Sequence, residues 1–203
     1  MPVLGITGGV ASGKSSFCAL LRARVPPSKA LWFDADAAVR QLTASDDTVR
    51  SQIRECFGDS FFAASGEVNR DMLRGAVFSN KGQLERLNAI LHPRVRSVWA
   101  ALAENARKSK LWLFAEIPLL YETGGSDLCD KVIVVACSYR TQIRRITGAR
   151  GLTESTAQKI IAAQSSLEEK CRRADILVWN DAALASLERQ TGLLAGWLNH
   201  NYA

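Results

Sequence analysis

Residues 8–15 read Gly8-Gly9-Val10-Ala11-Ser12-Gly13-Lys14-Ser15 and have the spacing of a phosphate-binding loop: a glycine, four residues, then Gly-Lys-Ser. The apolar run 3–7 precedes the loop and predicts a strand. Apolar residues at helical spacing follow the loop from Ser15 to Val25. Strand, glycine-rich turn and helix in this order form the context that the motif requires. The stretch therefore predicts an α/β protein that binds nucleotide phosphates, rather than a chance pattern in a Gly/Ser-rich turn.

Each part of the loop has an expected role. Glycines let the backbone curl so that successive N–H groups point at phosphate oxygens, and the positive end of the following helix dipole adds to this attraction. Lys14 is expected to reach the β- and γ-phosphates of ATP, and the Ser15 hydroxyl to hold Mg²⁺. The expected nucleotide contacts are Gly8, Gly9, Ala11, Ser12, Gly13, Lys14, Ser15 and Ser16.

Four more apolar runs, 30–33, 111–117, 131–136 and 175–179, predict strands separated by helical patterns. Continuous apolar strands are typical of parallel sheets that are covered on both faces. The sequence therefore predicts an α/β fold with a five-stranded parallel sheet and helices on both faces; the resemblance described below implies that this is a P-loop kinase core.

The chain is expected to form one domain, 1–203, that carries two additions. Between 43 and 109 the pattern is almost wholly helical, which is too long for a simple crossover between strands. We therefore expect a helical insertion at approximately 60–110 that shapes an acceptor pocket, and a lid at approximately 140–155. Helices in the stretch 43–109 are expected to begin near Asp46, Asn69 and Lys81, and Asn180-Asp181 are expected to cap the final helix of the chain.

Composition narrows the partners and the compartment. The formal charge of +6 favours an anionic partner of any kind. The five cysteines include no C-x-x-C pair, and no signal peptide or membrane-spanning run is visible, so we expect a cytoplasmic protein that does not bind membranes. The five tryptophans occupy apolar positions and are expected in the core rather than on a stacking surface, which argues against nucleic acid.

Two carboxylates, Asp34 and Asp36, follow the strand 30–33 at the edge where α/β sheets bind ligands. If extended, they point to opposite sides, so that one faces metal-bound water and the other an acceptor hydroxyl. The alternative for either residue is capping of the next helix.

Basic residues supply the remaining candidates. Arg144, Arg145 and Arg150 are expected to form a basic lid that neutralises charge on the transferring phosphoryl group, the alternative being a solvated helix face. Candidates for polar contacts in the insertion are Arg70, Arg74 and His92; for His92 a capping or buried structural role is equally open.

Several motifs, taken together in order and spacing, resemble the bacterial dephospho-CoA kinase family over nearly the whole chain. They are Gly8–Ser16, Phe33-Asp34-Ala35-Asp36, Leu91-His92-Pro93, Ile117-Pro118-Leu119-Leu120-Tyr121-Glu122, Ala162-Ala163-Gln164, and Ala174-Asp175 with Asn180. The resemblance implies ATP-dependent phosphorylation of the ribose 3′-hydroxyl of dephospho-CoA, the last step of coenzyme A synthesis. It also implies that the helical insertion is the family's CoA domain.

The resemblance implies roles for single residues as well. Asp36 takes the position of the general base, and Lys14, Arg145 and Arg150 complete the catalytic set. The acceptor pocket would include Asp34, which also assists with the metal, together with Arg70, His92 and Glu122. Asn180 would lie near the adenine.

One departure from the family pattern is Ala11, where the family usually has glycine. A methyl group is tolerable there if φ is negative, so ATP binding is expected to persist.

Two alternatives remain open at the level of the sequence. One is a P-loop kinase for another hydroxyl acceptor, such as a nucleotide or a sugar acid. The other is a nucleotide-switch module that regulates a partner and transfers nothing, which should lack a catalytic carboxylate.

Overall fold

The computed structural model describes residues 1–202, with backbone only at residues 78–79 and 149–150. The chain divides into two compact units. The first consists of Met1–Phe33 and Leu102–Ala203, and the second of Asp34–Ala101. The second unit includes much of the expected insertion but begins earlier, directly after the strand 30–33.

The first unit contains a parallel sheet with the strand order β2-β3-β1-β4-β5. The strands are β1 (Val3–Gly8), β2 (Ala30–Asp34), β3 (Trp112–Glu116), β4 (Lys131–Ala136) and β5 (Ile176–Trp179). This confirms the predicted five-stranded parallel sheet. The apolar runs identify the strands because a sheet covered on both faces needs apolar residues at successive positions.

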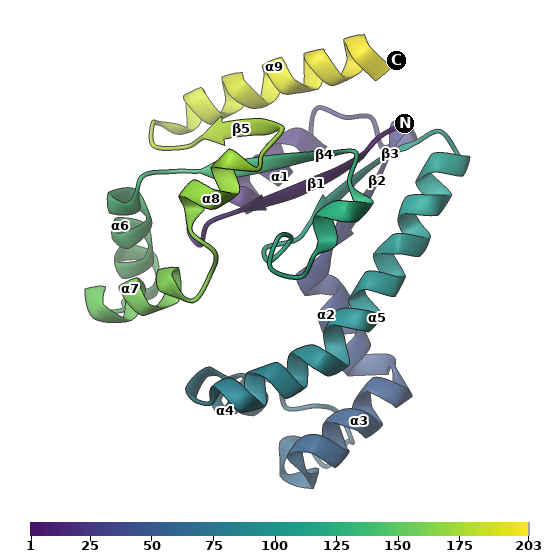
Figure 1. The fold of residues 1–203 in the computed structure, drawn as a ribbon, viewed down its shortest axis with the longest axis vertical. Helices are drawn as coiled ribbons and strands as arrows, with labels where there is room; N and C mark the ends of the chain where they lie inside the picture. The colour runs from purple at the N-terminus through teal and green to yellow at the C-terminus, as the bar shows by residue number, and fades with distance from the viewer. Residues whose placement is uncertain (203) are drawn as a thin grey trace. The chain divides into compact units, whose positions relative to one another are not determined.

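Helices cover both faces of the sheet (Figure 1). Helix α1 (Lys14–Arg22) packs against α9 (Leu184–Tyr202) on one face, where both contribute to one core. The other helices of this unit are α6 (Tyr139–Arg150), α7 (Glu154–Ala162) and α8 (Leu167–Arg172), and the 3-10 helices are η1 (Pro27–Lys29) and η3 (Gly125–Leu128). In β5, Val178 faces the α1 and α9 core, so Leu177 and Trp179 face the opposite side.

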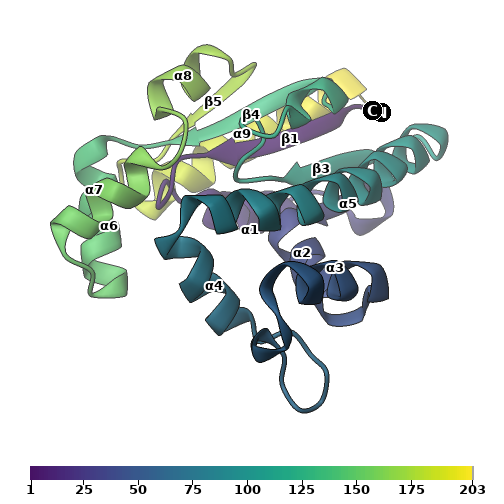
Figure 2. The ribbon, with the colours of Figure 1, turned by 60° about the horizontal axis from the view of Figure 1, so that its bottom comes forward.

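The second unit consists of α2 (Ala35–Ser45), α3 (Asp47–Phe57), the 3-10 helix η2 (Asp59–Phe61), α4 (Arg70–Ser79) and the first part of α5 (Lys81–Lys108) (Figure 2). Asp46 and Asn69 cap α3 and α4 by accepting hydrogen bonds from backbone N–H groups, so the predicted helix starts are confirmed. The unit has its own core of buried apolar side chains: Val49, Ile53, Val68, Leu73, Val77 and Leu91.

Two local predictions are wrong. Asn180 and Asp181 do not cap the final helix, which begins at Leu184. Asp181 instead accepts hydrogen bonds from the backbone N–H (2.8 Å) and the hydroxyl (3.1 Å) of Ser138. The tryptophans are not all in the core either, because Trp179 is 46% and Trp197 41% exposed. Among the described helices, none combines the length and the apolar character needed to cross a membrane.

Candidate active site

The loop between β1 and α1 has the properties of an anion site. Helix α1 begins at Lys14 without a side-chain cap and without an acidic residue in its first turn. The first N–H groups of a helix have no partner within it, and the helix dipole makes this end positive. Both features suit a phosphate group placed at this end of α1.

The loop packs too closely against its neighbours to accept a larger residue at two of its glycines. Gly13 has φ 90°, and a Cβ on it would lie 2.1 Å from Asn180 Nδ2. A Cβ on Gly8 would lie 2.2 Å from the carbonyl oxygen of Val135. Within the described residues, the Ser12 hydroxyl is buried without a hydrogen-bond partner. The residues present therefore fit a bound phosphate chain.

Three side chains hold the loop through its carbonyl groups. Gln142 Nε2 donates to Val10 O (2.8 Å), Arg145 Nη1 to Ala11 O (3.1 Å), and Asn180 Nδ2 to Ser12 O (2.8 Å). Arg145 also donates to the carbonyl of Asn180 (2.9 Å). Arg145 and Asn180, both expected to contact the nucleotide, thus support the loop; direct contact with ATP stays a prediction. Gln142 was not expected from the sequence.

Ala11 does not meet the condition set from the sequence. Its φ is 57°, in the left-handed region, where the expectation required a negative value. A residue with a Cβ pays about 1–2 kcal/mol in this conformation relative to the right-handed one. The loop therefore carries backbone strain at the position where the family usually has glycine.

Glu116, at the end of β3, is a site residue that the sequence analysis missed. Its carboxylate forms an ion pair with Lys14 Nζ and accepts a hydrogen bond from Ser15 Oγ at 3.3 Å. The pairing of β1 with β3 sets Ile6 opposite Glu116, which places Glu116 beside the loop. The signal was available, because a carboxylate at the carboxyl end of a central strand lies where α/β sheets bind ligands.

Glu122 has partners that the sequence did not indicate. Its Oε1 accepts from Lys170 Nζ (2.9 Å) and from the backbone N–H of Ser165 (3.0 Å), and the Lys170 side chain is fully buried. Lys170 also donates to the carbonyl of Pro118 (3.2 Å), which accepts from the Thr7 hydroxyl as well. Burial alone would raise the pKa of Glu122, but its hydrogen bonds and the Lys170 charge lower it below the ordinary value.

The two aspartates after β2 do not alternate along an extended chain. Asp34 ends β2 and caps α2 by accepting from Ala37 N (3.0 Å), which is the capping alternative, and Arg40 lies 3.9 Å from its carboxylate. Asp36 lies in the first turn of α2. Asp34 and Asp36 therefore do not point to opposite sides of a strand, contrary to the expectation, because the helix begins at Ala35.

The second unit brings Asp36, Arg70 and Arg74 together. All three line a cavity of about 650 Å³ between α2, α4 and α5, whose floor is apolar and includes Leu73, Val77, Leu87 and Leu91. His92, expected in the acceptor pocket, is not among the lining residues. It is half-buried in the middle of α5, and burial lowers the pKa of its imidazole.

For two further predicted residues, no side-chain contact within the site is found among the described residues. Ser16 is exposed on α1. Arg150 is the last residue of α6, and its side chain lies outside the described part of the chain, so its role in a lid stays a prediction.

Comparison with known proteins decides the family. Residues 2–186 match the family model of dephospho-CoA kinase. A dephospho-CoA kinase of Fusobacterium nucleatum is 34% identical over 185 residues, covering 91% of this chain and 92% of the relative. The enzyme of the same name from Geobacillus kaustophilus is 36% identical, covering 96% of each chain. The chain belongs to the dephospho-CoA kinase family.

Solved structures share the fold. A protein of Thermus thermophilus has a TM-score of 0.75 at 31% identity, with 97% of each chain covered. A Campylobacter jejuni dephospho-CoA kinase has the same fold, with a TM-score of 0.74 at 22% identity over 99% of this chain and 98% of that one. Membership of the dephospho-CoA kinase family makes this protein a kinase, for which ATP is the implied phosphoryl donor.

We expect Lys170→Met to lower the free energy of unfolding by about 2 kcal/mol at pH 7, measured by urea denaturation. The substitution keeps most of the side-chain volume but leaves the partly buried Glu122 carboxylate without its cation. Arg172→Met on the same helix is the matched control. Arg172 pairs with Glu168 in solvent, so its loss should cost less than about 0.5 kcal/mol. Equal effects of the two variants would contradict a stabilising buried pair.

The difference in the free energy of unfolding between wild type and Lys170→Met should depend on pH. The pKa of Glu122 is lower in the folded than in the unfolded protein, so its contribution is complete above the unfolded pKa and is lost as the pH falls through the folded one. The difference between wild type and Lys170→Met should therefore shrink as the pH falls below about 4.3. A difference that stays constant down to the acid transition would show that Glu122 is not its source.

Proposed function

We propose that this protein transfers the γ-phosphoryl group of Mg-ATP to the 3′-hydroxyl of dephospho-CoA, giving coenzyme A. The observation that carries the proposal is the phosphate loop with its Lys14 and Glu116 pair, in a chain of the dephospho-CoA kinase family. Phosphoryl transfer depends on positioning and on charge stabilisation more than on covalent chemistry, so the roles below are of these two kinds.

On the donor side, Lys14 and the N–H groups at the start of α1 would hold the phosphates, and Glu116 would position Lys14 and Ser15. Ser15 is the proposed ligand of Mg²⁺, with Glu116 holding one of its waters; the ion supplies neutralisation of charge on the β- and γ-phosphate oxygens. Supporting this are the carboxylate of Glu116 beside the Ser15 hydroxyl and the preference of Mg²⁺ for oxygen ligands and water.

On the acceptor side, Asp36 is the proposed general base, which accepts the proton of the 3′-hydroxyl during attack. Arg70 and Arg74 line the same cavity and suit the anionic groups of the acceptor. A single guanidinium group can donate two parallel hydrogen bonds to two oxygens of one phosphate. Asp34, as the cap of α2, would orient the turn that carries Asp36. His92 and Glu122 stay predicted contacts of the acceptor.

The segment 140–155 is the proposed lid, and residues 60–110 the proposed acceptor-binding insertion. Arg145 and Arg150 would place positive charge near the transferring phosphoryl group. Arg145 has a backbone partner in the loop itself, so its guanidinium is anchored within the site rather than in solvent.

The direct test is incubation of the purified protein with ATP, Mg²⁺ and dephospho-CoA, followed by chromatography and mass spectrometry of the product. We expect 3′-phosphorylated product. Phosphorylation of a nucleotide or a sugar acid in place of dephospho-CoA would assign the acceptor differently, and ATP binding without any transfer would support a nucleotide switch.

Asp36→Asn should reduce kcat by about 10²-fold or more and leave ATP binding nearly unchanged, because it removes the base but keeps the size of the side chain. Turnover is measured in steady state and ATP affinity by calorimetry. Asp47→Asn, on the exposed first turn of α3, is the control and should have wild-type kcat. A wild-type rate for Asp36→Asn would refute the role as base.

Glu116→Gln should lower kcat/KM by about 10- to 100-fold and raise the Mg²⁺ concentration needed for half-maximal rate, as expected when a residue that orients the metal site is neutralised. A Mg²⁺ titration at saturating ATP measures this. Glu104→Gln, whose ion pair with Lys108 is exposed on α5, should leave both quantities unchanged. An unchanged Mg²⁺ requirement in Glu116→Gln would exclude Glu116 from the metal site.

A further inference from the structure

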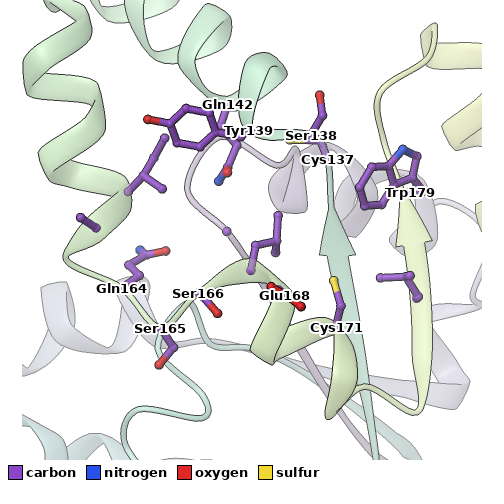
Figure 3. Close-up of a pocket in the computed structure, with 15 residues that line it drawn as sticks. Cys137, Ser138, Tyr139, Gln142, Gln164, Ser165, Ser166, Glu168, Cys171 and Trp179 are labelled. Carbon is purple, nitrogen blue, oxygen red and sulfur yellow. The ribbon is translucent and has the colours of Figure 1, made fainter.

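A second cavity, of about 630 Å³, lies within the first unit between α6, α7 and α8 (Figure 3). Its walls include the apolar side chains of Ile161, Leu167 and Leu177 and the rings of Tyr139 and Trp179. Tyr139, Leu177 and Trp179 are each about half exposed, so a considerable apolar area is open to solvent here. Cavities of this size and lining are typical of small-molecule sites.

The polar groups that line the cavity are few, and all of them except the Glu168 carboxylate are uncharged. Gln164, Ser165 and Ser166 lie along the segment that joins α7 to α8, where they offer amide and hydroxyl groups (Figure 3). All fifteen lining residues are described; none of them is Lys or Arg, and Glu168 is the charged one. A phosphate group would find no countercharge among the lining residues, and the one lining carboxylate, that of Glu168, already pairs with Arg172, so the lining favours an uncharged ligand with hydrogen-bonding groups.

The cavity begins at the phosphate loop. Gly9 of the loop is one of its lining residues, and so is Gln142, whose side chain holds the loop at Val10 O. A substrate held at the loop therefore lies beside an uncharged, largely apolar cavity.

The pantetheine arm of dephospho-CoA has the matching chemistry: it is uncharged and consists of a dimethyl-substituted carbon, methylene groups, a hydroxyl, two amides and a terminal thiol. We infer that the cavity between α6, α7 and α8 binds the pantetheine arm of the acceptor. This inference rests on the proposed function for the identity of the acceptor. The competing occupant is the adenine of ATP, which would stack on Tyr139 or Trp179.

A cysteine in the cavity provides a direct readout. Cys171 lines it and is partly exposed, whereas Cys137, which also lines it, is buried. Burial raises the pKa of the Cys171 thiol, so alkylation is run at alkaline pH. Cys56, exposed in the second unit, is the internal control.

The first experiment measures the rate of alkylation of each cysteine by iodoacetamide, using peptide mass spectrometry. S-methylated dephospho-CoA is the probe, because it does not consume the reagent. It should slow alkylation of Cys171 about tenfold and leave Cys56 unchanged, whereas ATP should protect neither. Protection of Cys171 by ATP, or no protection by the probe, would overturn the inference.

The second experiment fills the cavity. Ala162 lines it and is exposed on α7, so Ala162→Trp narrows the space without burying a larger group in the core; Ala163→Trp, at the next exposed position but outside the lining, is the matched control. Loss of arm burial should raise KM for dephospho-CoA about tenfold in Ala162→Trp, with KM for ATP unchanged. A raised KM for ATP, or no change in either, would contradict the assignment.

The two experiments separate this inference from the proposed function. Wild-type protein that fails to phosphorylate dephospho-CoA refutes the function, while protection of Cys171 still decides whether the arm enters the cavity. If circular dichroism shows that Ala162→Trp does not fold, the alkylation rates of the wild type alone decide.

Discussion

The site depends on how the carbonyl groups of the phosphate loop are bound. Gln142, Arg145 and Asn180 donate to three consecutive carbonyls, those of Val10, Ala11 and Ser12. These hydrogen bonds fix the backbone of the loop, and an anion site built from backbone N–H groups depends on such a fixed backbone. Because these donors come from α6 and from the segment after β5, the C-terminal half of the chain stabilises a loop that lies near the N-terminus.

Much of the fold follows from the sequence because the sheet is buried on both faces. The run 131–136 predicts β4 to the residue, and the other runs predict their strands to within two residues, since each is apolar at nearly every position. The helix starts near Asp46 and Asn69 are predicted correctly as well, because the capping that defines them is a local interaction between residues three apart.

The errors arise where the partner of a residue is distant in the sequence. Asp181 looks like a cap for α9 but binds Ser138, 43 positions away. Trp179 sits in an apolar strand, yet β5 is the edge of the sheet and α8 leaves part of that face open as a cavity. Local patterns carry no information on either arrangement, because both depend on the order of strands in the sheet.

In the candidate site, too, local features can be predicted from the sequence and long-range contacts cannot. The loop residues are contiguous and have a known spacing, so the sequence identifies them. Glu116 and Lys170 act through partners about 100 and 50 positions away, Lys14 and Glu122 respectively, and only the register of β1 with β3 and the packing of α8 reveal them. The ion pairs of the site therefore become visible only in the structure, whereas its phosphate-binding loop can be predicted from the sequence.

Ala11 illustrates why the loop tolerates a residue that the family pattern disfavours. A left-handed alanine costs about 1–2 kcal/mol, whereas a hydrogen bond that involves a charged group contributes about 1.5–3 kcal/mol. The carbonyl of Ala11 accepts such a bond from Arg145. The strain and a bond large enough to offset it therefore belong to the same residue. The methyl group at position 11 is therefore compatible with an intact phosphate loop, although for a different reason from the negative φ expected from the sequence.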